Sequence, residues 1–242
     1  MTAPPVAVIA GVGEGLGYAL GKRFAKGGYN VALVARNAER LARLADAIKA
    51  AGGQAFAAPT DLRTEGEVVA LFDEVEAEHG AVEVAVYNAG ANFRASILET
   101  PADMFEKVWK LGCYAGFLFA REAARRMAPR GKGSILFTGA TASVRGASHF
   151  AAFAAAKGGL RQVAQSMARE LGPKHIHVAH VVIDGMIDTV AVRARFPERV
   201  KEMPENSLLD TDAIAEAFYA IHVQPSSAWT FESDLRPFLE KF

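Results

Sequence analysis

The stretch VAVIAGVGEGLGYALGKRFAKGG, residues 6–28, joins a short apolar run to a helical pattern through closely spaced glycines. The run at 6–10 has five consecutive apolar residues, which is typical of a strand buried on both faces of a parallel sheet. The apolar residues that follow the glycines recur at helical spacing and predict a helix over 15–27. The stretch therefore predicts the strand, turn and helix that open a βαβ series.

The same alternation of short apolar runs and amphipathic stretches continues along the chain. Five further runs are predicted as strands: 31–35, 54–58, 82–87, 134–138 and 177–183. Helical patterns lie between and after them, at 37–51, 64–79, 102–128, 150–171 and 210–222. Right-handed crossovers between parallel strands then give an α/β fold, a doubly wound Rossmann-like parallel sheet with helices on both faces.

No repeat, low-complexity tract or linker divides the chain, so we expect a single domain over residues 1–242. The stretch 185–209 carries prolines and charges and is expected to be a flexible excursion on the substrate side. The tail 224–242 contains four aromatic residues, Trp229, Phe231, Phe238 and Phe242. Because so many aromatics are rarely left in solvent, we expect the tail to pack on the body or on a neighbouring subunit.

Composition excludes several classes of function. The 27 basic side chains balance 27 acidic ones, which argues against nucleic-acid binding and against a charged membrane surface. No apolar run is long enough to span a bilayer, and no basic region precedes the first apolar run as in a signal peptide. The single cysteine, Cys113, cannot form an internal disulfide, so we expect a cytoplasmic protein. His175 and His177 lack a further cluster of ligands, so no metal site is expected.

Glycines at 11, 15 and 17 form a G-x-x-x-G-x-G pattern between the first strand and the first helix. Glycine lets the backbone approach a pyrophosphate closely, and a helix N-terminus offers free N–H groups and a partial positive charge. A glycine-rich turn alone is a weak signal, but this one begins a βαβ series. We therefore expect a nucleotide to bind here.

Two further motifs follow the glycine loop in order: Asp61 in PTDLR, and Asn88-Ala89-Gly90 after the fourth strand. Together they resemble the short-chain dehydrogenase/reductase family, and the likeness covers nearly the whole chain. The resemblance implies an NAD(P)(H)-dependent oxidoreductase in which the aspartate meets the adenine and N-A-G supports the strands beside the cofactor. The implied cofactor-binding residues are Gly11, Gly15, Leu16, Gly17, Arg36, Asp61, Leu62, Asn88, Ala89, Gly90, Lys157, Gly185 and Thr189. From the residues alone, a turn or helix-cap role is the alternative for Asp61, and a structural role is the alternative for Asn88.

The end of the second strand bears on the choice of cofactor. Ala35 stands where an NAD enzyme often has a carboxylate, and Arg36 follows it. Arg36, with Arg40 as a second candidate, would pair with a 2′-phosphate, so NADP(H) is favoured over NAD(H). Glu14 in the glycine loop opposes this choice because its charge would repel the phosphate. Arg36 as a solvated surface charge is the alternative.

The family's catalytic tetrad is largely absent. The family's Y-x-x-x-K falls on Phe153 and Lys157, its catalytic serine on Ala140, and its asparagine on Cys113. Only the lysine remains, and a phenyl ring neither donates nor accepts a proton. We expect Lys157 to bind the nicotinamide ribose; the alternative is that its ammonium group reaches solvent.

Three nearby side chains are candidate substitutes for the missing donors. Thr141 and Ser143 lie close to the serine position, and His149 precedes Phe153 by four residues. Each also has an ordinary interpretation, since loop hydroxyls often cap turns and a histidine at a helix start is often solvated. Tyr114 is expected to pack away from the site. Asp184 either faces the substrate or shapes the turn before Gly185.

Two functions of different classes are consistent with these residues. The first is an NADP(H)-linked oxidoreductase of an unidentified small molecule, using non-standard proton donors or reducing an activated double bond. The second is a catalytically impaired NADP(H)-binding protein that acts as a redox sensor or partner subunit. Small residues in the helices predicted at 102–128 and 150–171 permit close approach, and family members associate through the equivalent helices. We therefore expect a homodimer or homotetramer.

Overall fold

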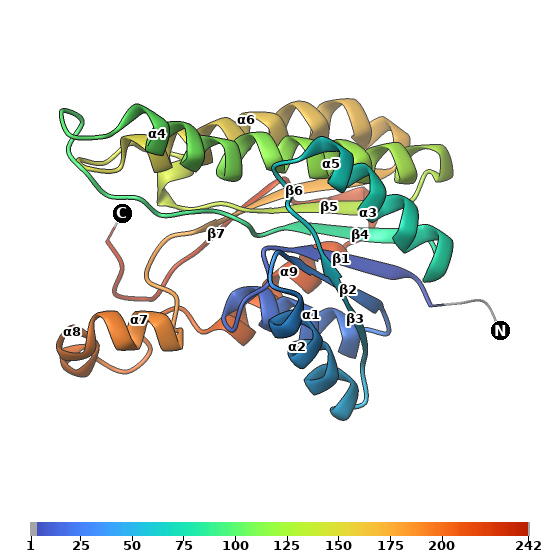
Figure 1. Cartoon of the computed structure of the whole chain (residues 1–242), viewed down its shortest axis with the longest axis horizontal. Coiled ribbons are helices and arrows are strands. Elements are labelled where there is room, and N and C mark those ends of the chain that lie inside the picture. Colours follow the sequence, from blue (N-terminus) through green and yellow to red (C-terminus); the bar gives the residue numbers. More distant parts are fainter. Residues whose placement is uncertain (1–3, 242) are drawn as a thin grey trace.

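The computed structural model describes residues 4–241 and has a central sheet between two layers of helices (Figure 1). The strands are β1 Val6–Ala10, β2 Asn30–Ala35, β3 Gln54–Pro59, β4 Val82–Tyr87, β5 Gly133–Thr138, β6 Ile176–Ile183 and β7 Glu232–Leu235. The helices are α1 Leu16–Lys26, α2 Ala38–Ala50, α3 Glu65–Glu78, α4 Ala102–Trp109, α5 Ala115–Met127, α6 Ala151–Leu171, α7 Val190–Arg195, α8 Pro197–Glu202 and α9 Thr211–His222.

All strand pairs are parallel, and the strand order is β3-β2-β1-β4-β5-β6-β7. The chain winds outward from β1 to β3 and then returns to place β4 on the other side of β1. Crossovers therefore leave β1 and β4 in opposite directions, which opens a crevice at their carboxyl ends. The predicted α/β class, the parallel sheet and the single domain are confirmed.

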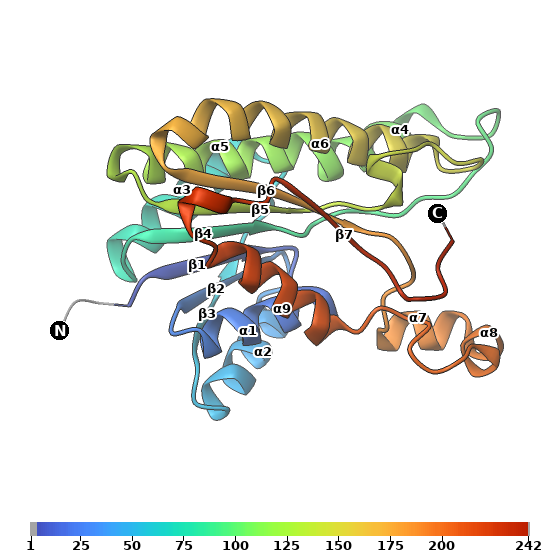
Figure 2. The ribbon, with the colours of Figure 1, turned by 180° about the vertical axis from the view of Figure 1, so that it is seen from behind.

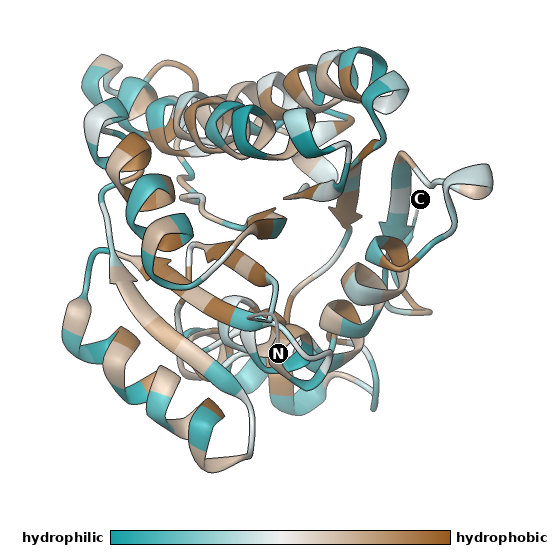
Figure 3. Cartoon of the chain, turned by 90° about the vertical axis from the view of Figure 1, so that its right-hand side faces the viewer, coloured by the Kyte–Doolittle hydropathy of each residue, from teal (hydrophilic) through white to brown (hydrophobic). Residues whose placement is uncertain are grey.

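Each face of the sheet has its own hydrophobic core. Phe72 and Phe119 are fully buried between the sheet and the layer of α3, α5 and α6. Leu20 and Phe218 are fully buried on the opposite face, under α1, α2 and α9. Figure 3 shows strands of mainly apolar residues, whereas the helices alternate between apolar and hydrophilic residues. Burial on both faces explains why the strands read as continuous apolar runs.

The helix predicted over 102–128 is interrupted by a π-helical turn, Lys110–Tyr114, between α4 and α5. Within this turn, the Leu111 carbonyl accepts a hydrogen bond from the hydroxyl of Tyr87, the last residue of β4. Burial raises the pKa of the Tyr87 phenol, which keeps it protonated as a donor. The irregular turn, which includes Cys113, is thereby held against the end of β4.

The C-terminal third contains elements that the sequence did not predict. The stretch 185–209 includes α7 and α8, and the tail supplies β7, which pairs in parallel with β6. The sequence of β7, ESDL, lacks an apolar run, in keeping with a strand that has no buried residue. Phe242 of the predicted tail lies outside the described residues. None of the helices within residues 4–241 has the length and apolar character needed to cross a membrane.

Candidate cofactor and active site

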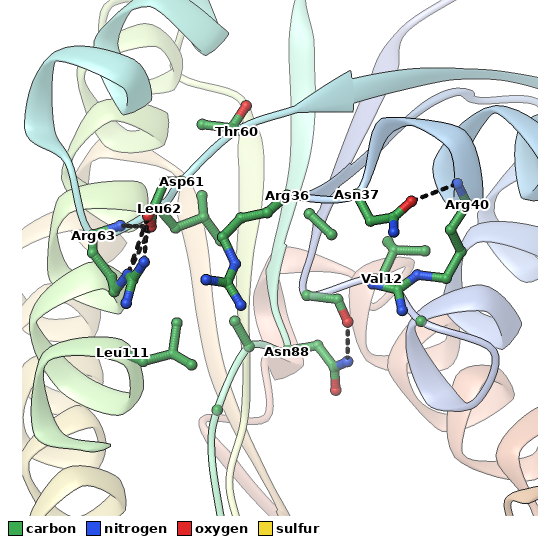
Figure 4. Close-up of a pocket in the computed structure, with 15 residues that line it drawn as sticks. Val12, Arg36, Asn37, Arg40, Thr60, Asp61, Leu62, Arg63, Asn88 and Leu111 are labelled. Atoms are coloured by element: carbon green, nitrogen blue, oxygen red, sulfur yellow. Dashed lines mark hydrogen bonds and ion pairs between the residues drawn. The ribbon is translucent and has the colours of Figure 1, made fainter. Parts of the chain in front are cut away.

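A cavity of about 700 Å³ opens at the carboxyl ends of the first strands (Figure 4). It is lined by Gly11, Val12, Gly13, Ala35, Arg36, Asn37, Arg40, Thr60, Asp61, Leu62, Arg63, Asn88, Ala89, Gly90 and Leu111. These residues come from the connections after β1, β2, β3 and β4 and from the π-helical turn. The cavity therefore occupies the crevice where the strand order reverses, the usual ligand position in such sheets.

The glycine loop needs glycine for close packing. Gly11 has a φ of 82°, and a Cβ there would lie 2.5 Å from the backbone nitrogen of Ala89. A Cβ on Gly17 would lie 2.6 Å from the carbonyl oxygen of Gly11, and Leu16 beside it is buried. The Asn88 amide donates to the same Gly11 oxygen at 3.1 Å. Asn88 thus ties the loop to β4, which is the structural role that the sequence left open.

The start of α1 meets the segment after β6. A Cβ on Gly15 would lie 2.7 Å from the methyl carbon of Thr189. Thr189 is the N-cap of α7, where its hydroxyl accepts from the Val192 N–H at 3.2 Å. Gly185 has a φ of 151° and packs against Pro237 of the tail. Thr189 and Gly185, which are both expected to bind the cofactor, therefore lie beside the glycine loop and the tail, respectively.

Asp61 is held by an arginine two residues further on. Both of its carboxylate oxygens accept from the Arg63 guanidinium, with Arg63 Nε 2.8 Å from Oδ1. This pairing lowers the pKa of Asp61 to about 2. Thr64, and not Asp61, occupies the N-cap position of α3, so the helix-cap alternative is wrong. Leu62 is buried beside Asp61 and joins the hydrophobic core.

One end of the cavity is basic. Arg36, Arg40 and Arg63 extend toward the same space in Figure 4. Among the described residues, neither Arg36 nor Arg40 forms an ion pair, and the buried Nε of Arg40 has no hydrogen-bond partner. Glu14, which opposed a phosphate on sequence grounds, is bound by Arg43 of α2. Its charge is therefore balanced within the protein.

Lys157 is buried, with 5% of its surface exposed. Its Nζ donates to the Thr138 carbonyl oxygen at 2.6 Å and lies 3.5 Å from where a Cβ on Gly90 would stand. Burial lowers the pKa of Lys157 to about 8. The alternative that its ammonium reaches solvent is wrong. No cation–π contact joins it to Phe153 in the described part of the chain, where the recorded contacts involve other pairs.

Phe153, Ala140 and Cys113, which the sequence resemblance puts at three tetrad positions, lie in α6 or on segments that pack against it. Phe153 is half-buried in the first turn of α6, and Ala140 follows β5. Cys113 is buried in the π-helical turn, where its sulfur would lie 2.8 Å from a Cβ on Gly159. Both the π-helical turn and the turn after β5 pack against α6. Burial raises the pKa of the Cys113 thiol, so the thiol stays protonated and is at best a weak donor.

Two of the three candidate substitutes hydrogen-bond to other groups, and the third, His149, lies outside α6. The Thr141 hydroxyl donates to the Asp184 carboxylate, whose other oxygen lies 3.1 Å from the Arg236 guanidinium. Ser143 is buried within its turn, and its hydroxyl oxygen accepts from the Ala140 N–H at 3.1 Å. His149 is exposed, has a φ of 69° and precedes the start of α6, so it does not share a helical face with Phe153.

Tyr114, His175 and His177 also have defined positions in the structure. The Tyr114 ring stacks on Trp109 at 6.2 Å between centroids, which agrees with a packing role. His175 lies before β6 in a left-handed conformation with a φ of 59°, so it does not share a strand face with His177. Within residues 4–241, no group of three or more His, Cys, Asp or Glu side chains is arranged to hold a metal.

A buried polar cluster lies under α6 and was not predicted from the sequence. His180 of β6 is fully buried, and its Nδ1 lies 3.0 Å from Glu232 of β7. Arg161, one turn after Lys157, binds the same carboxylate through two hydrogen bonds of 2.6 and 2.8 Å. Burial lowers the pKa of His180 to about 4. No sequence signal could have revealed this cluster, because β7 itself was not predicted.

The chain was compared with known proteins. The short chain dehydrogenase family matches residues 5–200. A short-chain dehydrogenase/reductase of Armillaria gallica is 32% identical over 176 residues, covering 72% of this chain and 67% of the relative. The 3-oxoacyl-(acyl-carrier-protein) reductase MabA of Mycobacterium tuberculosis is 31% identical over 195 residues, 81% of this chain and 74% of that protein.

Solved structures give the same result. A short-chain dehydrogenase from Rhodopseudomonas palustris is 46% identical and has a TM-score of 0.82, with 97% of this chain and 98% of that one covered. A metagenomic short-chain oxidoreductase in complex with NADP is 26% identical and has a TM-score of 0.83, with 97% and 98% covered. The matched fold and the family match over most of the chain lead to one conclusion: this chain belongs to the short-chain dehydrogenase/reductase family.

Proposed function

We propose that the protein is an NADP(H)-dependent oxidoreductase of a small molecule, with a non-standard active site. One observation carries the proposal: Arg36 and Arg40 line the cavity without an ion-pair partner among the described residues, and Lys157 is buried beside Gly90 at its other side. A similar metagenomic protein was solved in complex with NADP.

The residues of the cavity fit a dinucleotide phosphate. A Cβ on Gly13 would meet only open space, so backbone here faces the cavity and offers room for a pyrophosphate. The unpaired guanidinium groups of Arg36 and Arg40 match the geometry of a 2′-phosphate. The ion pair with Arg43 supports this choice, since it balances the charge of Glu14.

Lys157 would hold the nicotinamide end. Its ammonium group has three donors, of which one is used on Thr138, so donors remain for ribose hydroxyls. The bound cofactor supplies a hydride for reduction. Lys157 would orient the ribose, and Gly185 and Thr189, which lie next to the tail and the glycine loop, would border the nicotinamide side.

Without the tetrad side chains, the protein should be slow in reactions that need a proton donor or a hydrogen bond to a developing oxyanion. General acid–base catalysis contributes about 10²–10⁴-fold to typical rates, and one donor to a developing oxyanion about 10²–10³-fold. Phe153 and Ala140 supply neither. We therefore expect reduction of simple ketones and aldehydes to be severely slowed, although the two effects are not additive.

Calorimetric titration of NADPH tests the proposal. Lys157→Ala removes hydrogen bonds from a charged group, worth roughly 1.5–3 kcal/mol, so its affinity for NADPH should fall about ten- to a hundredfold. Lys174→Ala, at an exposed lysine beyond α6, is the matched control and should bind as wild type does. Absence of NADPH binding by the wild type, or equal affinity in Lys157→Ala, would contradict the proposal.

A second function is favoured by the tetrad itself. With Phe153, Ala140 and Cys113 at three of four positions, the protein would bind NADP(H) with little turnover and act as a redox sensor or partner subunit. The buried single cysteine fits a reducing compartment such as the cytoplasm. Consumption of NADPH against a mixed panel of carbonyls and activated alkenes separates the two functions, since only an oxidoreductase oxidises the cofactor.

A further inference from the structure

We propose that the substrate is an apolar molecule with a carbon–carbon double bond conjugated to a carbonyl group, and that the protein reduces this double bond. The inference rests on the proposed NADP(H)-dependent function and names its substrate class. Two independent features carry it: the described hydroxyl and imidazole groups near the tetrad positions do not replace the missing donors, and apolar side chains collect around the same edge of the sheet.

The first feature restricts the reaction. The Thr141 hydroxyl donates its hydrogen bond to the Asp184 carboxylate, and Ser143 is buried in its own turn, where its oxygen accepts from the Ala140 N–H. His149 is exposed and lies outside α6. Phe153 stands where the family has its proton donor. A hydride acceptor that must receive a proton on oxygen during the transfer is therefore poorly served by this site.

A conjugated double bond relaxes that requirement. Reduction of a saturated ketone places the new charge on an alkoxide, whose conjugate acid is about as weak as water, with a pKa of about 15.7. Hydride addition to the β-carbon of an enone gives an enolate, whose oxygen is closer in basicity to a phenolate, with a conjugate-acid pKa of about 10. The anion is stabilised by its own conjugation, so a strong hydrogen-bond donor is less necessary.

The reaction balances with the proposed cofactor and water. The β-carbon gains a C–H bond as NADPH is oxidised to NADP⁺, and the π-electron pair of the double bond moves to form the enolate. A proton from water then adds to the α-carbon and restores the carbonyl group. The product is the saturated ketone, and one NADPH and one proton are consumed for each double bond.

The second feature concerns the surroundings of the site. Seven of the eleven large hydrophobic residues that are exposed within the described residues lie on connections after the carboxyl ends of β4, β5, β6 and β7. We call them the apolar rim: Ile97, Leu98, Val144, Val190, Phe196, Phe238 and Leu239. Leu98 is the most exposed, at 94%, followed by Val190 at 78% and Phe238 at 73%.

The segments that carry the rim share one end of the molecule. The loop from β4 to α4, helices α7 and α8 and the C-terminal tail lie at the left in Figure 1 and at the right in Figure 2. The Ala95 N–H donates to the His149 carbonyl at 3.0 Å, which joins the loop after β4 to the loop before α6. Pro237 packs on Gly185, which joins the tail to the connection after β6.

An apolar substrate accounts for both features together. The tetrad positions replace polar side chains with a methyl group, a phenyl ring and a buried thiol, and the surrounding rim is apolar as well. An uncharged molecule with an alkyl chain would bury the rim, and each buried methylene would tighten binding about fourfold. A second copy of the chain on the rim is the competing occupant, and it is an outcome of the test below.

The test compares matched nine-carbon probes, (E)-3-nonen-2-one and its saturated product 2-nonanone, with NADPH. We expect the enone to be reduced at least a hundredfold faster than the saturated ketone. With NADPH deuterated at the transferring position, the label should appear at C4 of 2-nonanone. Calorimetry of the protein loaded with NADP⁺ should show 2-nonanone binding at least tenfold more tightly than 2-pentanone.

Variants test the rim. Leu98→Asp should weaken binding of 2-nonanone about tenfold without changing the affinity for NADPH, whereas Val223→Asp, an exposed residue at the end of α9, should change neither. If NADPH binds but the enone is reduced no faster than 2-nonanone, the inference is overturned and the proposed cofactor use stands. If NADPH does not bind, both the inference and the proposed cofactor use are wrong. Equal binding of both ketones, with Leu98→Asp abolishing self-association, would assign the rim to a second copy and overturn the inference.

Discussion

The Nζ of Lys157 donates to the carbonyl oxygen of Thr138 at 2.6 Å, with no carboxylate of the described residues in ion-pair distance. A charged group in such a place is costly unless it finds further partners. Burial accordingly lowers the pKa of Lys157 to about 8. The hydroxyls of a bound ribose would favour the charged form again, because they accept hydrogen bonds from it.

This relationship predicts a pH dependence of cofactor affinity. If binding favours the ammonium form, it raises the pKa of Lys157 and takes up a proton. Affinity for NADPH should then be constant below pH 7 and fall as the pH rises through 8, toward the higher pKa of the bound state. Titration calorimetry between pH 7 and 9.5 in buffers of different ionisation enthalpy measures both effects. Lys157→Arg keeps its charge in this range and should show no such fall; a fall of equal size in that variant would assign the effect to another group.

The basic end of the cavity predicts a preference between cofactors. NADPH should bind at least several-fold more tightly than NADH. Arg36 would form charge-assisted hydrogen bonds with the 2′-phosphate, which NADH lacks. Arg36→Ala should lower the affinity for NADPH and leave that for NADH nearly unchanged. Arg43→Ala should also weaken NADPH binding, since it releases the charge of Glu14. Equal affinities for both cofactors, insensitive to Arg36→Ala, would show that the arginines do not select the phosphate.

The outer face of α4 and α5 predicts self-association. Phe105, Trp109 and Phe117 are 37%, 40% and 38% exposed on this continuous helical segment, and family members associate through the equivalent helices. We expect a homodimer or homotetramer by light scattering at micromolar concentration. Trp109→Glu should shift the mass toward the monomer, whereas Val223→Glu should leave it unchanged. A monomeric wild-type protein would refute the prediction.

The buried cluster under α6 predicts loss of stability in mild acid. The pKa of His180 is lowered to about 4 by burial, against about 6.5 in an unfolded chain. Between pH 6.5 and pH 4, His180 is therefore protonated in the unfolded state but not in the folded state. The free energy of unfolding should fall over this range, by up to roughly 3 kcal/mol from this residue. Urea unfolding at pH 7 and pH 4.5 measures the loss, and His180→Gln should reduce it. A loss of the same size in the variant would mean that other groups dominate.

Much of the fold could be predicted because burial on both faces leaves continuous apolar runs. The runs at 6–10, 31–35, 54–58, 82–87, 134–138 and 177–183 all lie in strands of the sheet. The predicted helix boundaries lie within two residues of the observed ones where the sequence contains a cap or turn residue. Asp210, which caps α9, is an example. Strand β7 and helices α7 and α8 were not predicted, because β7 has no buried residue and helices of six residues are too short to show helical spacing.

The site was predictable only where a motif places residues at short spacing. Phe153 and Lys157 lie four residues apart on one helix, so their joint position followed from the sequence alone. Candidate residues also contact partners that are distant in the sequence. Lys157 donates to Thr138, Thr141 donates to Asp184, and Glu14 pairs with Arg43. These contacts depend on how separate elements pack, which spacing does not encode.

The central claim is that the cofactor site is intact while the proton-donating groups are missing. The most direct measurement is the turnover of a saturated ketone panel by the wild type and by the triple variant Phe153→Tyr, Ala140→Ser, Cys113→Asn, with NADPH affinity measured for both. We expect equal NADPH affinity, negligible turnover by the wild type, little gain from Phe153→Tyr alone and measurable turnover by the triple variant. Brisk wild-type reduction of simple ketones would contradict it.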